Sequence, residues 1–291
     1  MNKQQDNFKY RTQKQYAVRI LIPTDFSELS KVAIRYAVHF SKDTEVALVL
    51  LHIIDINAPG MARIGSKKLG EAIKTSSEEG MKELVASIKK DNSHKIDISY
   101  KIIHSSSIEK AVEIAALENK INLICIGTKG ASGLKKILFG SNAAGIIENS
   151  SIPVLTIPEF ADYKSNGHMV YSSDLYHLEE EIGYIIPFAK LMDSWIHILH
   201  IDRGKEGFEG DLQKKQESLR KDLSYQKIKF SELKSSSIIE GINKFITEVD
   251  ADMVVMFTHH TNFLEKVFQK SVTQNTAFQT RIPLLTFQKE K

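Results

Sequence analysis

The most suggestive residues of this 291-residue chain are glycines that could hold a phosphate group. Gly127 and Gly130 are followed, after nine residues, by the pair Gly140-Ser141. Glycine can adopt positive φ, and successive N–H groups in such a loop form an anion-binding concavity. Ser141 then begins a predicted helix, whose positive end and hydroxyl favour phosphate. The segment predicts a triphosphate-binding loop that matches neither the P-loop nor the G-x-G-x-x-G fingerprint.

A carboxylate and an apolar residue are predicted to complete this site. Asp25 follows the apolar run Val18–Pro23, and Ile53 lies near the end of a second apolar run, Val46–Ile54. In a doubly wound sheet, ligands bind beyond the carboxyl ends of the strands, where the strand order reverses. Asp25 could there hydrogen-bond a ribose or a base edge, and it could also cap the first helix, a role that is compatible with ligand contact. Ile53 could form a wall for the base.

Strands and helices alternate along the first half of the sequence. Apolar or alternating runs predict strands, and apolar residues at helical spacing recur between them. This alternation is typical of an α/β domain with a parallel sheet and helices on both faces. The predicted strands are Val18–Pro23, Val46–Ile54, Ile96–Ile103, Asn122–Ile126 and Val154–Ile157.

Taken together, these motifs resemble the ATP-binding branch of the universal stress protein family. The spacing Gly-x2-Gly-x9-Gly-Ser, the opening Pro23-Thr-Asp25-Phe-Ser27, the strand end His52-Ile-Ile-Asp55 and the closing Pro153-Val-Leu are similar to its motifs. The resemblance covers Val18 to Pro158 well and Met169 to Phe287 loosely. It implies an adenine nucleotide alpha hydrolase-like fold.

The same resemblance implies a cofactor, which is ATP, with ADP or AMP as alternatives, accompanied by Mg2+ or Mn2+. Asp25 and the backbone at Ile53 would face the adenine and ribose, and Gly127 would lie near the ribose. The residues implied to contact the nucleotide are Pro23, Thr24, Asp25, Ile53, Gly127, Gly130, Gly140, Ser141 and Asn142, of which the last four would hold the phosphates.

One segment departs from the family pattern. The family usually has a glycine just after the third strand, where this chain has His104-Ser-Ser-Ser107. These side chains are expected to crowd the rim of the nucleotide site. The serines are also candidates to cap the helix that follows.

The second half of the sequence repeats the pattern of the first. Asp174 lies 149 residues after Asp25, and Pro283 lies 130 residues after Pro153. The repeat indicates two tandem doubly wound five-stranded parallel-sheet domains, the second shortened between Gly204 and Lys234. The expected divisions are a polar lead-in at 1–15, a nucleotide-binding domain at 16–158, a linker at 159–167 and a degenerate domain at 168–291.

The second copy lacks the glycine loop. Phe257, His260 and Lys270 stand in the places of Gly127, Gly130 and Gly140. A β-carbon at those positions would strain the loop or block the phosphates, so no ATP is expected there.

The last strand of each copy is predicted to take part in a pairing of the two domains. The family resemblance implies dimerisation through this strand, and Val154–Ile157 and Leu284–Phe287 are its two versions in this chain. Such pairing would cover sheet edges that otherwise invite aggregation. A homodimer of tandem chains remains a further alternative.

Composition limits the class of protein. The net charge of +3 is too mild to argue for nucleic acid, and no basic stripe with interleaved aromatics occurs. No stretch approaches the roughly 18 apolar residues of a membrane span. Cys125 is the single cysteine, which fits a reducing compartment. We therefore expect a cytoplasmic protein with neither a nucleic-acid nor a membrane partner.

No catalytic residue and no metal-ligand set is predicted. His52 and His200 are interpreted as packed structural histidines, and His259-His260 has no cysteine or acidic partner at ligand spacing. No general base for attack on a γ-phosphate can be assigned. The predicted function is an ATP-binding stress sensor or regulator that acts on an unidentified protein partner. The alternatives are a nucleotide-independent interaction module and a slow ATPase.

Overall fold

The computed structural model describes residues 18–42, 45–56, 67–92, 96–128, 141–204, 212–257 and 281–288. In the first half, strands and helices alternate as the hydrophobic pattern predicts. The elements are β1 (Val18–Pro23), α1 (Glu28–Phe40), β2 (Val46–Asp55), α2 (Lys67–Asp91), β3 (Asp97–Ser105), α3 (Ile108–Glu118), β4 (Leu123–Gly127), α4 (Ser141–Asn149) and β5 (Val154–Ile157).

The second half follows the same order of elements. They are β6 (His168–Ser172), α5 (Leu178–Leu191), β7 (Trp195–Asp202), α6 (Leu212–Asp222), β8 (Ile228–Lys234), α7 (Ile238–Glu248), β9 (Met253–Phe257) and β10 (Leu284–Phe287). The helix after the second strand has 25 residues in the first half and 11 in the second. The predicted shortening between Gly204 and Lys234 is therefore confirmed.

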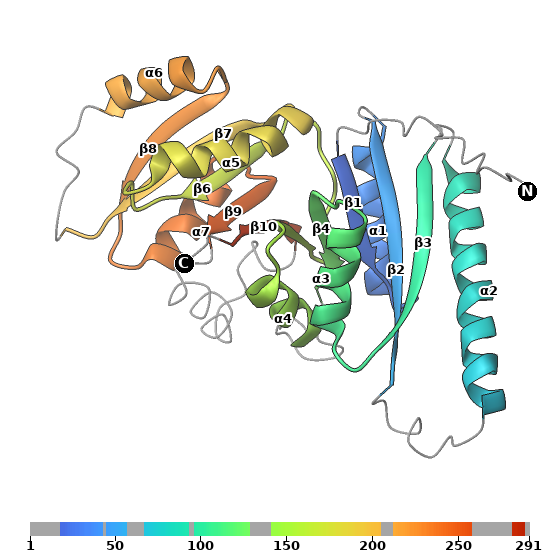
Figure 1. Ribbon diagram of the computed structural model, residues 1–291. Helices are drawn as coiled ribbons and strands as arrows, with labels where there is room; N and C mark the ends of the chain where they lie inside the picture. The colour runs from blue at the N-terminus through green and yellow to red at the C-terminus, as the bar shows by residue number, and fades with distance from the viewer. Residues whose placement is uncertain are drawn as a thin grey trace, which may run out of the picture.

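The strands form one 10-stranded sheet in the order β3-β2-β1-β4-β5-β10-β9-β6-β7-β8. Figure 1 shows the two halves meeting through their last strands, with α2 beside β3 at one end and α6 beside β8 at the other. Each half is a doubly wound parallel sheet, because its first strand lies between its second and its fourth. This order fixes where a ligand cavity can open in each half.

The two halves join through an antiparallel pairing of β5 and β10, in which Leu155 lies opposite Leu285. Two buried threonines add side-chain bonds, since Thr156 Oγ1 donates to the Leu284 carbonyl at 3.2 Å and Thr286 Oγ1 to the Val154 carbonyl at 3.1 Å. The predicted pairing of the last strands is therefore present within the chain. It leaves β3 and β8 as the edges of the sheet.

Apolar layers cover both faces of the sheet. One continuous core runs through both halves and contains residues of α1, α2, α5 and α6. On the opposite face, one core lies under α3 and α4 and another under α7. Strands buried on both faces carry mostly apolar residues, which explains the apolar runs that predicted β1 and β2. The carboxyl ends of the central strands lie between these layers.

Candidate functional site

A cavity of about 380 Å³ opens at the carboxyl ends of β1, β2 and β4 in the first half. The strand order reverses between β1 and β4, which is the position expected for a ligand in this topology. The cavity is lined by Pro23, Thr24, Asp25, Ser27, Leu29, Ser30, Leu51, Ile53, Ile108, Ile126, Gly127, Asn142, Ala143 and Ile146.

Most of the residues predicted for the nucleotide lie around this cavity. They come from four separate segments, and they are Pro23, Thr24, Asp25, Ile53, Gly127 and Asn142. Ser141 is the first residue of α4, although its side chain is not described. Gly130 and Gly140 lie outside the described residues. The lining also includes Ile108 and Ile146, which sequence reasoning missed because their helical periodicity indicated only core packing.

The turn between β1 and α1 is held in one conformation by side chains. Phe26 adopts a left-handed φ of 64°, which is unusual for a residue other than glycine. Its N–H donates to Thr24 Oγ1 at 3.1 Å, and His52 Nδ1 donates to the Thr24 carbonyl at 2.9 Å. The Phe26 and His52 rings pack with centroids 4.6 Å apart. The structural role predicted for His52 is confirmed, and the turn fixes the direction of Asp25, which lies between Thr24 and Phe26.

Asp25 presents an exposed carboxylate at the cavity. Its Oδ1 accepts the Ser27 N–H at 3.0 Å. Burial raises the pKa of Asp25, but hydrogen bonds from Ser27 and Ser30 outweigh burial and leave that pKa below its usual value. The carboxylate is ionised at neutral pH and can accept hydrogen bonds from hydroxyl or amino groups. Ser27, rather than Asp25, caps α1, through a bond from the Ser30 N–H at 3.3 Å.

Gly127 is required by close packing at the end of β4. A Cβ at this position would lie 2.4 Å from the carbonyl oxygen of Leu29, a backbone atom that cannot move aside on its own. The missing side chain lets the start of α1 approach the end of β4 beside the cavity. This packing within the chain is a reason for the glycine in addition to the predicted approach of a ligand, which stays a prediction.

The described residues fit an adenine nucleotide. Ile53, Ile108, Ile126 and Ile146 form an apolar wall suited to a flat base, while Asp25 supplies an acceptor for hydroxyl groups. Asn142 lies in the first turn of the nine-residue helix α4, where unpaired N–H groups favour an anion. The lining of the cavity therefore combines apolar side chains that suit a base with polar groups that suit hydroxyls and an anion.

The expected crowding by His104–Ser107 is wrong, since none of these four residues lines the cavity. Ser107 instead caps α3 and accepts the Lys110 N–H at 3.2 Å, as the alternative prediction proposed. Ser105 Oγ donates to the Ser107 carbonyl at 2.8 Å and so turns inward to the backbone. The hydroxyls of Ser105 and Ser107 thus bond within the turn and the start of α3, and Ile108 is the next residue, which lines the cavity.

Sequence comparisons identify the relatives of this chain. Universal stress protein MJ0531 of Methanocaldococcus jannaschii is 30% identical over 141 residues, which are 48% of this chain and 81% of that protein. Universal stress protein MJ0577 of the same organism is 32% identical over 152 residues and is covered to 93% of its length. The chain belongs to the universal stress protein family. The family profile, described as "Universal stress protein family", matches residues 18–158, which span β1 to β5.

The solved structures extend the fold of this universal stress protein to both halves. A universal stress protein from Archaeoglobus fulgidus superposes with a TM-score of 0.70 at 18% identity, covering 95% of this chain and 98% of that one. A functionally unknown protein from Pseudomonas aeruginosa gives a TM-score of 0.60 at 14% identity, covering 93% and 92%. At these identities the likeness establishes the fold alone.

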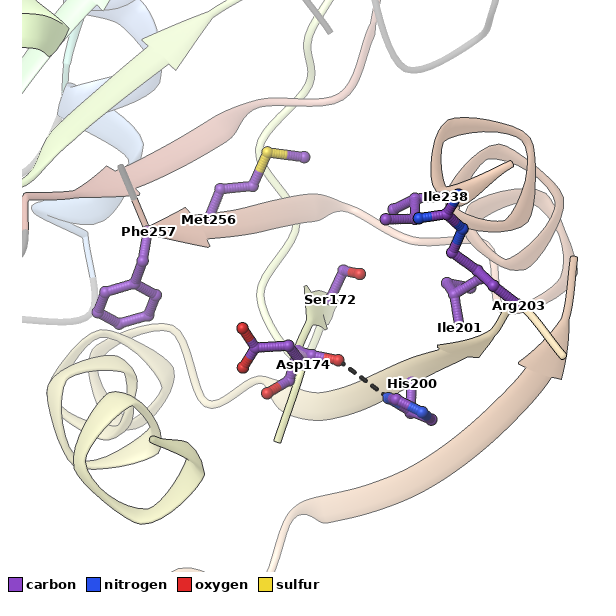
Figure 2. Close-up of a pocket in the computed structure, with 9 residues that line it drawn as sticks. Ser172, Asp174, His200, Ile201, Arg203, Ile238, Met256 and Phe257 are labelled. Atoms are coloured by element: carbon purple, nitrogen blue, oxygen red, sulfur yellow. Dashed lines mark hydrogen bonds between the residues drawn. The ribbon is translucent and has the colours of Figure 1, made fainter. Parts of the chain in front are cut away.

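The second half of this universal stress protein has a smaller cavity at the equivalent place. It measures about 220 Å³ and is lined by Ser172, Ser173, Asp174, His200, Ile201, Arg203, Ile238, Met256 and Phe257. Figure 2 shows these side chains around the ends of β6, β7 and β9. The signal for this pocket in the sequence is the repeat itself, because Asp174 and Ile201 stand at the positions of Asp25 and Ile53 even though the glycines are not repeated.

The described residues were also compared with the requirements of a metal site and of a membrane-spanning helix. No group of three or more His, Cys, Asp and Glu side chains gathers there in a way that could bind a metal ion. His259 and His260 lie outside that part of the chain. None of the helices in the same part has the length and hydropathy that a bilayer crossing requires.

Proposed function

We propose that this universal stress protein binds ATP in the first-half cavity and acts as a stress-response sensor or regulator. The observation that carries the proposal is the meeting, in one cavity, of Asp25, Ile53, Gly127 and Asn142 from separate segments. Family membership and the spacing of Gly130 and Gly140 support the same ligand. ADP or AMP would use the same base and ribose contacts, and Mg2+ or Mn2+ would accompany the phosphates.

Each group of residues has a defined task in this proposal. The isoleucine wall takes the adenine, and the Asp25 carboxylate accepts hydrogen bonds from the nucleoside. The backbone at Gly127 lies against the ribose, and Gly130, Gly140, Ser141 and Asn142 bind the phosphates. A bound triphosphate supplies concentrated negative charge, which the N–H groups at the start of α4 attract.

In this proposal the chain divides into a nucleotide-binding domain at 16–158, a linker at 159–167 and a degenerate domain at 168–291. The second domain serves as the structural partner of the first, through β5 and β10. The protein acts in the cytoplasm, as a single chain or as a homodimer, on a protein partner. Signalling requires that the bound and empty states differ in their affinity for that partner.

Titration calorimetry of the nucleotide-stripped chain with Mg-ATP tests the proposal. We expect saturation at a single site per chain, and no binding by the double variant Gly130→Val, Gly140→Val. The matched control changes the corresponding positions of the second half, His260→Val and Lys270→Val, and should bind as the unchanged chain does. Parallel titrations with ADP, AMP and Mn2+ rank the ligands.

The outcome separates the three candidate functions. Absence of heat in every protein would leave a nucleotide-independent interaction module as the better account. Turnover of ATP well above background, lost in Ser141→Ala, would instead favour an ATPase. Binding without turnover supports the sensor.

A further inference from the structure

We propose that the cavity at the ends of β6, β7 and β9 is a second ligand site, which accepts a nucleoside and excludes a nucleoside triphosphate. The inference rests on the proposed function in one respect only: it places the base at the apolar wall and the sugar at the aspartate, as proposed for the first cavity. The site itself is defined by its own lining, which includes Asp174, Ile201, Arg203, Ile238 and Met256. These residues lie in the half of the chain for which sequence analysis predicts no ATP.

The second cavity keeps the part of the first that would surround a nucleoside. Asp174 replaces Asp25 at the turn, and its Oδ1 accepts the Tyr176 N–H at 3.1 Å, as Asp25 accepts Ser27. The apolar wall is also kept, because Ile201, Ile238 and Met256 stand at the positions of Ile53, Ile108 and Ile126. A flat base and a hydroxyl-bearing sugar therefore find the same chemistry in both halves.

The turn that aims Asp174 is maintained despite an unfavourable backbone conformation. Leu175 has a left-handed φ of 72°, which corresponds to the 64° of Phe26. Its N–H donates to Ser173 Oγ at 3.0 Å, and His200 Nδ1 donates to the Ser173 carbonyl at 3.2 Å. The second of these bonds is drawn in Figure 2. The predicted structural role of His200 is confirmed, and the turn keeps the same shape as in the first half.

The part that would hold phosphates has been replaced. The chain has Phe257, His260 and Lys270 where the first half has glycines, and these residue types disfavour the close backbone approach that a phosphate-binding loop needs. The cavity is also smaller, at about 220 Å³ against about 380 Å³. A nucleoside needs neither the cradle nor the additional space, whereas a triphosphate needs both.

Arg203 gives the second cavity a property that the first one lacks. It stands at the position of Asp55, so an acidic side chain at the end of the second strand becomes a guanidinium. Figure 2 shows Arg203 beside Ile238 on one side of the pocket, with Asp174 on the other. A planar guanidinium stacks well on aromatic rings. A purine base stacked on this guanidinium and bordered by the apolar wall, with its sugar towards Asp174, would use the basic, apolar and acidic side chains of the lining.

Titration of the full chain with adenosine in excess Mg-ATP tests this site, because ATP would keep the first cavity filled. We expect adenosine to bind at a single site per chain under these conditions. Ile238→Trp, which fills the second cavity, should weaken that binding about tenfold or more, and so should Asp174→Asn. Asp174→Asn is an exposed change that keeps the acceptor for Tyr176, so it preserves the fold if Ile238→Trp does not.

The matched variant of the first cavity, Ile108→Trp, keeps the two proposals apart. Ile108→Trp should abolish ATP binding and leave adenosine binding in place. Ile238→Trp should weaken adenosine binding and leave ATP binding in place. Three results would overturn the inference: no adenosine binding, adenosine binding that Ile108→Trp removes and Ile238→Trp does not, or ATP binding at the second cavity as tight as that of adenosine. Failure of ATP to bind at all would contradict only the proposed function.

Discussion

Gly127 at the end of β4 and Phe257 at the end of β9 occupy equivalent places in the two halves, and the structure accommodates them in opposite ways. At Gly127 the Leu29 carbonyl comes so close that a Cβ would lie 2.4 Å away. At Phe257 the ring stacks on Phe287 at 5.0 Å between centroids and packs edge-on against Tyr171 at 5.7 Å. One half uses the space for backbone approach, and the other fills it with aromatic core.

The start of the adjacent helix changes with this residue. Helix α1 begins at Glu28 with the Ser27 side chain as its cap, whereas α5 begins one position later in the repeat, at Leu178, and His177 makes no capping bond. Figure 2 shows the Phe257 ring pointing away from Ile238 and Arg203. The comparison teaches that the position of a glycine beside one cavity can hold an aromatic core residue in the other half while a cavity is still present there.

The largest effect is expected at Phe257, whose side chain is 2% exposed. Phe257→Ala should lower the free energy of unfolding by about 3–5 kcal/mol, because it removes a ring from a packed aromatic cluster. Denaturant unfolding measures this loss. Phe160→Ala, at a side chain that is 62% exposed, is the control and should change stability by less than about 0.5 kcal/mol. Equal effects at the two positions would show that Phe257 is not part of the core.

Gly127 should show the reciprocal behaviour. Gly127→Ala is expected to cost about 1–3 kcal/mol of stability, because the new methyl group meets the Leu29 carbonyl, and to weaken ATP binding as the turn shifts. Thermal unfolding and ATP titration of the same protein measure both. The control is Gly183→Ala in α5, where no atom lies within 4 Å of the new Cβ and a gain of roughly 0.5–1 kcal/mol is expected. A stabilised Gly127→Ala would contradict the packing described for β4.

A buried polar pair distinguishes the second half from the first. Tyr171 OH donates to the carboxylate of Glu181, a residue of α5 with 0% exposure, where the first half has Ile22 and Val32. Tyr171→Phe removes that donor from a desolvated carboxyl group and should cost about 1–3 kcal/mol.

Urea unfolding at neutral pH measures the effect, with Tyr176→Phe as the exposed control. The double change Tyr171→Phe, Glu181→Gln should recover part of the loss, since a neutral amide is easier to bury than a charge. No recovery would show that the loss does not come from the carboxyl group left without its donor.

The smallest change in stability at neutral pH is expected from substitution of His197, a residue of the second half whose equivalent in the first half is Val49. Burial, helped by the nearby charges of His168 and Lys229, lowers the pKa of His197 to about 4. The folded protein therefore keeps this imidazole neutral while the unfolded chain takes up a proton below pH about 6.5. Stability should fall as pH drops from about 6.5 towards 4, by at most about 1.4 kcal/mol per pH unit from this residue.

His197→Val should flatten this part of the stability profile and leave it unchanged above pH 7. Chemical unfolding at intervals between pH 4.5 and 7.5 gives the two curves to compare. Curves that stay parallel across the whole range would show that His197 titrates normally in the folded state.

Local sequence patterns predicted the strands well where both faces of the sheet are buried. Val18–Pro23 and Val154–Ile157 have the same limits in the structure as in the sequence, because each is an apolar run bounded by residues that stop it. The third strand extends to Ser105, two residues beyond its predicted end at Ile103, because an edge strand carries a weaker apolar signal. The pairing of β5 with β10 followed from the family resemblance and not from periodicity.

The sequence by itself determined the alternation of strands and helices, the order of the two copies, and the glycines and aspartates at their strand ends. These features depend on backbone conformation and local hydrophobicity, which neighbouring residues set. Only the tertiary structure decided that Ile108 and Ile146 face the first cavity, that His104–Ser107 leave it open, and that Phe257 joins an aromatic core beside a persisting pocket. Such outcomes depend on how segments far apart in the chain share a limited space, and no local pattern encodes that distribution.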